Sequence, residues 1–209
     1  MKFKILFFLC IYSLLFSQNK EIRFAYEYQF AQDSTKIDST FSELMYLDIS
    51  KEGSRFYSRD VFVGDSLMNN AIRQQKSSGK VYFDKNKGKQ RMTIKKFYPD
   101  FIITETTNIG FDRYEYQDKR KMNWQITNEL KTIEGFDVQK ATINAFGRKW
   151  TAWFSVAYPF QDGPYKFHGL PGIIVEIEDA KKGHIFTLKG IKNLKPEEAL
   201  SEEIGLKYF

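Results

Sequence analysis

The chain has 209 residues, of which 42% are apolar and 17% aromatic, and its 32 lysines and arginines against 26 aspartates and glutamates give a formal net charge of +6. This length predicts one domain, and the many Phe and Tyr side chains supply enough apolar area for a core, which excludes a wholly disordered chain. The single cysteine, Cys10, excludes a disulfide framework, a thiolate zinc site and an iron–sulfur cluster, and two histidines, His168 and His184, leave little for histidine-based metal or acid–base chemistry. We therefore expect no metal and no other cofactor.

The N-terminus has the layout of a secretory signal peptide. A short basic region precedes an unbroken apolar or weakly polar run over 5–16, and Ser17 opens a polar stretch. This run is shorter than the ~20 apolar residues that a spanning helix needs, although an uncleaved anchor or a buried strand are alternatives. We expect residues 1–18 to be removed. The remaining 19–209 would form a single β-rich domain, periplasmic or extracellular, with no transmembrane segment.

Apolar and polar residues alternate along most of the remaining chain. Near its start, Ile22, Phe24 and Tyr26 recur at every second position, and polar residues such as Arg23 lie between them. A period of two places one set of side chains on each face, which predicts half-buried antiparallel strands. The predicted strands are 22–30, 43–49, 55–63, 80–83, 90–98, 100–107, 111–118, 124–130, 136–144, 148–156, 172–178 and 184–194.

Only two stretches look helical. Apolar residues in 66–75 recur at spacings of one, three and four, and Pro196 opens a possible C-terminal turn. Strands separated by short polar turns predict a mainly β fold. We expect a curved antiparallel sheet or partly open barrel with one or two short helices. Its fold would be similar to that of the outer-membrane lipoprotein carriers, in which a sheet wraps around a helix.

The stretch 124–179 has the most individual sequence. Its motifs are Gly147-Arg148, Thr151-Ala152-Trp153-Phe154, Gly163-Pro164-Tyr165-Lys166-Phe167 and Gly169-Leu170-Pro171-Gly172-Ile173-Ile174. In these motifs the chain resembles the GLPGLI family of exported Bacteroidetes proteins. The resemblance implies export, a β-rich fold and the Bacteroidetes envelope, but no reaction, because the family has no settled activity. Family members often carry a cysteine near the position of Val138, so a thiol-dependent role would not transfer to this chain.

Gly163-Pro164 and Pro171-Gly172 bracket a loop that also contains Gly169. Glycine permits backbone conformations closed to other residues and proline fixes its own φ, so such a loop can present aromatic and cationic side chains to a ligand or partner. The candidate binding residues are Trp153, Tyr165, Lys166, Phe167, His168 and Leu170. In the alternative interpretation, Tyr165, Phe167 and Leu170 cap the end of the sheet and the glycines only turn the chain.

The inventory of catalytic residues is short. Glu176 and Glu178 share a strand face and could act as a carboxylate pair, and His168 or His184 could approach them to bind a metal, but two solvated acids are the alternative. No nucleophile elbow, HExxH, P-loop or dinucleotide motif occurs. We therefore assign no catalytic residue and expect no enzyme.

Three functions remain open. The first is an exported, non-catalytic protein that binds a lipid or another small apolar or amphipathic ligand, or an envelope partner. The second is an accessory protein that docks on an outer-membrane receptor, and the third is a hydrolase or metal-dependent enzyme. A carrier needs an enclosed apolar cavity, whereas a docking protein needs a filled core and an exposed apolar patch. Nucleic acid is not an expected partner, because no recognition motif is present.

Overall fold

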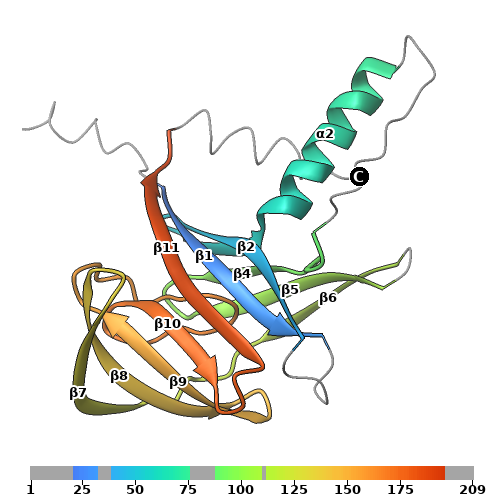
Figure 1. Cartoon of the computed structure of the whole chain (residues 1–209). Coiled ribbons are helices and arrows are strands. Elements are labelled where there is room, and N and C mark those ends of the chain that lie inside the picture. The colour runs from blue at the N-terminus through green and yellow to red at the C-terminus, as the bar shows by residue number, and fades with distance from the viewer. Residues whose placement is uncertain (1–20, 33–38, 76–87, 110–111, 196–209) are drawn as a thin grey trace, which may run out of the picture.

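Eleven strands pair into one antiparallel sheet in the computed structural model, which describes residues 21–32, 39–75, 88–109 and 112–195. Figure 1 shows the sheet strongly curved, with a helix extending from one end. The strands are β1 (Ile22–Ala31), β2 (Thr40–Ile49), β3 (Gly53–Ser58), β4 (Thr93–Phe97), β5 (Ile102–Ile109), β6 (Asp112–Asp118), β7 (Gln125–Ile133), β8 (Phe136–Ala145), β9 (Arg148–Ser155), β10 (Ile173–Asp179) and β11 (His184–Asn193).

The sheet runs in the order β6-β5-β4-β3-β2-β1-β11-β10-β9-β8-β7. Each strand therefore pairs with the next strand in the chain, apart from β6 and β7, and the pairing of β1 with β11 joins the two halves of the sheet. β6 and β7 follow each other in the chain but form the two edges of the sheet. The curved sheet is consequently open between β6 and β7.

The predicted mainly β fold is confirmed. The predicted strand over 55–63 is wrong in its second half, because β3 ends at Ser58 and helix α2 (Arg59–Gln75) begins immediately after it. The backbone N–H of Val61 donates to Ser58 Oγ at 3.2 Å, and Asp60 lies in the first turn, where a negative charge stabilises a helix. Ser58 followed by Asp60 is a signal for the start of a helix. Here this signal outweighs the alternation of apolar and polar residues that predicted a strand.

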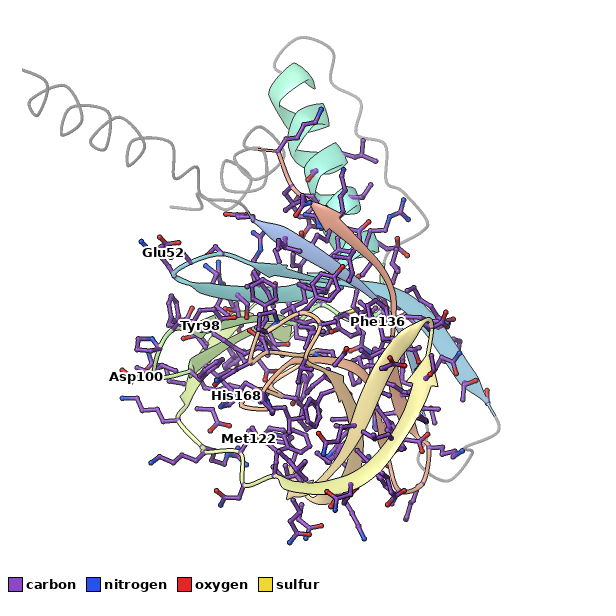
Figure 2. The ribbon with its side chains drawn as sticks, turned by 90° about the vertical axis from the view of Figure 1, so that its left-hand side faces the viewer. Glu52, Tyr98, Asp100, Met122, Phe136 and His168 are labelled. Carbon is purple, nitrogen blue, oxygen red and sulfur yellow. The ribbon has the colours of Figure 1, made fainter. Side chains whose placement is uncertain are left out.

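Helix α2 packs on β2 and β3 and points away from the sheet (Figure 1). The predicted helix over 66–75 is its C-terminal part. The inside of the curve is filled by side chains and by a loop rather than by a helix (Figure 2).

The signal peptide expected at 1–18, the strand at 80–83 and the turn at Pro196 lie outside the described residues. None of the described helical residues forms a span long and apolar enough to cross a membrane.

Successive side chains along the strands point to opposite faces of the sheet, as expected from the sequence. On β1, Phe24 and Tyr26 point inward and are fully buried, and Tyr28 stacks on Phe186 of β11 with ring centroids 4.1 Å apart. On the outer face, Arg23 of β1 donates to Asp48 of β2 at 2.8 Å. One face of the sheet is therefore the core, and the other carries charges.

Candidate functional site

Residues 156–172, which join β9 to β10, enter the curve of the sheet; we call them the core loop. Phe167 is fully buried, and its ring meets Trp150 of β9 edge-on with centroids 4.8 Å apart. Leu170 is 1% exposed, whereas Tyr165 is half-buried. The space beside Tyr165–Leu170 is therefore occupied by side chains of the loop itself.

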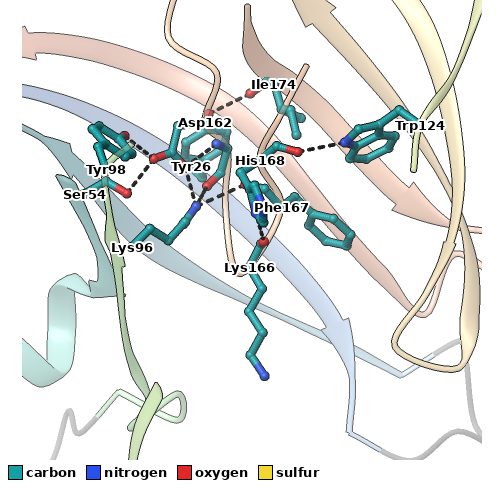
Figure 3. Close-up of polar contacts among 11 residues, drawn as sticks. Tyr26, Ser54, Lys96, Tyr98, Trp124, Asp162, Lys166, Phe167, His168 and Ile174 are labelled. Carbon is teal, nitrogen blue, oxygen red and sulfur yellow. Dashed lines mark hydrogen bonds and ion pairs between the residues drawn. The ribbon is translucent and has the colours of Figure 1, made fainter. Parts of the chain in front are cut away.

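A buried ion pair ties the core loop to the sheet (Figure 3). Both side chains, Lys96 of β4 and Asp162 of the loop, are 0% exposed. Lys96 Nζ also donates to the carbonyls of Gly163 at 2.6 Å and Phe167 at 3.1 Å, so each of its three protons has an acceptor. Burial lowers the pKa of Lys96, and the charge of Asp162 opposes that shift.

The carboxylate of Asp162 is fully engaged as well. It accepts hydrogen bonds from Ser54 Oγ at 2.5 Å, from the backbone N–H of Gly163 at 2.6 Å and from the Tyr98 hydroxyl. Burial and the negative charge of Asp162 raise the pKa of Tyr98, which keeps this phenol protonated as a donor. Among the described residues, no buried side-chain N or O atom lacks a hydrogen-bond partner. We assign this cluster to stability, because none of its groups is free to accept a substrate.

His168 is held by contacts within the core loop and with two residues outside it. Its Nδ1 lies 2.9 Å from the carbonyl of Lys166, and its ring stacks on Phe101 with centroids 4.6 Å apart. The indole N–H of Trp124 donates to the carbonyl of His168 at 2.8 Å. Burial lowers the pKa of His168, so the ring is neutral at pH 7. The contact with Trp124 fastens the loop to the connection between β6 and β7, and the contact with Phe101 fastens it to the turn between β4 and β5.

Lys166 reaches out of the core loop toward the open edge of the sheet. Its Nζ lies 2.6 Å from Glu105 Oε2 on β5 and contacts the hydroxyl of Tyr116 on β6. Burial opposes the charge on Lys166, but the contacts with Glu105 and Tyr116 raise its pKa above the ordinary lysine value. Lys166 is therefore a paired cation that links the core loop to edge strand β6.

Two tyrosines on β6 remain exposed although they occupy inward positions. Tyr116 lies opposite the buried Glu105, and Tyr114 lies opposite Thr107. The core ends before it reaches this edge, so Tyr114 is 50% and Tyr116 43% exposed. We call these two tyrosines the β6 face.

A cleft of about 500 Å³ opens between the connection from β6 to β7 and the turn from β8 to β9; we call it the basic cleft. Figure 2 labels Met122 in the connection, one of the residues that line it. Cations come from both walls, Arg120 and Lys121 on one and Arg148 and Lys149 on the other. The described residues that line the cleft include no acid. The cleft is thus suited to a negatively charged ligand.

The structure separates Trp153 from the other candidate binding residues. It lies on the outer face of the sheet, where Lys131 Nζ is 4.0 Å and Lys140 Nζ 5.9 Å from its ring centroid. Tyr165, Lys166, Phe167, His168 and Leu170 lie together in the core loop, and Lys166, Phe167, His168 and Leu170 are buried. The loop therefore offers most of its side chains to the core rather than to solvent.

The candidate acids and histidines are also placed apart. Glu176 pairs with Lys131 at 3.3 Å and Glu178 with Lys182 at 3.9 Å, as acids on a charged outer face do. His184 lies on the inner face, with Nδ1 2.8 Å from the Tyr28 hydroxyl. In the described ranges, no group of three or more His, Cys, Asp or Glu gathers closely enough to hold a metal ion.

The sequence analysis missed Lys96 and Asp162. The available signal is that Lys96 stands two residues after Ile94, at a position that alternation turns inward. A lysine at such a position requires a buried partner. The partner is 66 residues away in the chain, beyond any local pattern.

The glycines of the loop motif differ in what they require. A Cβ on Gly172 would lie 2.1 Å from the carbonyl oxygen of Ser155, whereas Gly169 has open space around it but a φ of +88°. Gly172→Ala should therefore lower the free energy of unfolding by about 1–3 kcal/mol through overpacking. Gly169→Ala should cost about 1–2 kcal/mol through backbone strain, and Gly169→Asn should cost less, because Asn tolerates the left-handed region. Urea denaturation measures these losses, and a Gly172→Ala variant as stable as the wild type would contradict the close packing.

One family model matches part of the chain. Residues 147–176, which include β9, the core loop and part of β10, match the model of a family described as "Protein of unknown function (Porph_ging)", a Bacteroidetes-type domain. No curated protein matches the chain significantly.

The solved structures that are similar to the chain include two of PNGF-II. "Structure of PNGF-II in C2 space group" has a TM-score of 0.56 at 11% identity and covers 88% of this chain and 29% of that one. "Structure of PNGF-II in P21 space group" has a TM-score of 0.55 at 11% identity and covers 88% and 30%. The chain thus spans about three tenths of the length of these structures. At this identity the likeness shows a shared fold alone.

Proposed function

We propose that this chain is an exported, non-catalytic binding protein of the GLPGLI type that docks on a protein partner in the bacterial envelope. Export is supported by the signal-peptide layout of residues 1–18. The GLPGLI assignment is supported by Gly169-Leu170-Pro171-Gly172, which lies within the segment matched by the Bacteroidetes-type family model.

One observation carries the docking proposal: the interior of the sheet is filled, while aromatic side chains at its open edge are exposed. Phe167 and Leu170 occupy the place where a carrier would hold an apolar ligand. Tyr114 and Tyr116, by contrast, each present about half of their surface to solvent. Tyrosine is enriched at protein interfaces because its ring supplies contact area and its hydroxyl a hydrogen bond.

Site-specific photocrosslinking in the producing cells tests this proposal. With a photoreactive phenylalanine at position 114, we expect a crosslink to one envelope protein, and a lower yield when Tyr116→Ser is added. Tyr116→Phe keeps the ring and should preserve the yield. The same photoreactive residue at position 180, an exposed site in the turn between β10 and β11, should give no such product.

Native mass spectrometry of the purified exported chain tests the alternative that the protein carries a bound small molecule. A bound lipid or other small molecule, together with no crosslink from position 114, would favour the carrier and overturn the docking proposal. A chain without a bound molecule, together with a Tyr116-dependent crosslink, supports docking.

A further inference from the structure

We infer that the basic cleft binds an extended, acidic segment of the docked partner, with the partner's carboxylates pairing with the cleft's cations. This inference rests on the proposed function and deepens it. The cleft adjoins the β6 face, because Lys166 contacts the Tyr116 hydroxyl and its Nζ lies 5.5 Å from the ring centroid of Phe146 in the cleft wall. One partner could therefore cover both.

The charge of the cleft is only partly neutralised by the protein. Arg120 pairs with Asp118 at 2.8 Å, and Arg148 pairs with the buried Asp179 at 2.8 Å. Lys121 and Lys149 have no ion pair within the described part of the chain. Two positive charges are thus left for a ligand, at a site where they attract carboxylates.

The wall of the cleft is held in position by the core. Phe146 adopts a φ of +53° and Gly147 one of +72°, which together form the tight turn between β8 and β9. The ring of Phe146 packs edge-on against Tyr165 at 5.4 Å and Phe167 at 5.5 Å. Arg120 Cζ lies 5.2 Å from the same ring centroid. A site that is ordered before binding loses less entropy when its ligand arrives.

Polar groups next to the cations favour a peptide over a lipid. A second hollow of about 320 Å³ shares Asn123, Asn144 and Lys149 with the basic cleft and adds Gln125 and Thr142. Side-chain amides both donate and accept, as peptide groups do. Gln125 also begins β7, an edge strand of the sheet, and an edge can pair with an extended chain.

The test uses the full exported chain and a defined probe, a fluorescent peptide of alternating Glu and Ser. We expect the peptide to bind, and added salt or replacement of Glu by Gln in the peptide to weaken binding. Lys121→Gln with Lys149→Gln should weaken it about ten-fold. Lys51→Gln with Lys181→Gln removes the same charge from exposed sites in other turns and should change affinity about two-fold or less. Thermal melting checks that both double variants are folded.

Any one of three results in the binding assay would overturn the inference: no binding of the peptide, equal losses in the two double variants, or tighter binding of phosphatidylglycerol vesicles or polygalacturonate than of the peptide. The crosslink from position 114 separates this failure from failure of the proposed function. If that crosslink forms and the Lys121/Lys149 variant leaves it unchanged, the inference fails and docking stands. If the crosslink never forms, docking itself fails, whatever the peptide does.

Discussion

Replacing Lys96 by methionine should lower the free energy of unfolding by about 3–5 kcal/mol, because it leaves the carboxylate of Asp162 buried without its counter-ion. Both side chains are 0% exposed, so water cannot take the place of the ammonium group. The carbonyls of Gly163 and Phe167 would lose a donor as well. These groups hold the core loop on the sheet, so the variant should unfold more easily. Urea denaturation should show this loss of stability as a lower midpoint.

Two comparison variants isolate the buried charge as the cause. Lys189→Met removes an exposed lysine that pairs with Glu134 and should cost less than about 1 kcal/mol. Lys96→Met combined with Asp162→Asn removes both charges and should recover part of the loss, because the amide needs no counter-ion and its oxygen can still accept from Ser54 and Tyr98. Losses of equal size in Lys96→Met and Lys189→Met would contradict a structural role for the ion pair.

The strands were predictable because their signal is local. A period of two appears within a few residues, so alternation along β1 or β9 shows both the strand and its buried face. The pairing of β1 with β11 joins residues such as Ile22 and Asn193, which no local pattern connects. Helix α2 was mislocated at its start, because the inward alternation of β3 runs up to Ser58, which also caps the helix.

The burial of the core loop could not be predicted from local sequence either. Its glycines and prolines identify it as a loop, and loops usually lie on the surface. Here it is buried because distant groups satisfy its polar atoms: Lys96 from β4 and Trp124 from the connection before β7. The basic cleft was equally hidden, because it arises only when Arg120 is brought beside Arg148 by the pairing of β7, β8 and β9.

The two tryptophans of β9 offer a matched test of the inner and outer faces. Trp150 is 4% exposed, packs on Phe167 and donates its indole N–H to the carbonyl of Ala145 at 3.0 Å. Trp150→Ala should therefore lower the free energy of unfolding by about 3–5 kcal/mol. Trp153 lies on the outer face beneath Lys131, so Trp153→Ala should cost about 1–2 kcal/mol, mainly through the lost cation–π contact.

Two further variants separate packing from hydrogen bonding at these positions. Trp150→Phe keeps most of the ring in the core and loses the bond to Ala145, so it should cost about 1–2 kcal/mol. Lys131→Gln removes the cation above Trp153 and should reproduce part of the Trp153→Ala loss. Because Trp150 also supports the β8–β9 turn, Trp150→Ala should weaken peptide binding in the basic cleft, whereas Trp153→Ala should not. Equal stability losses at the two positions would contradict the assignment of faces on β9.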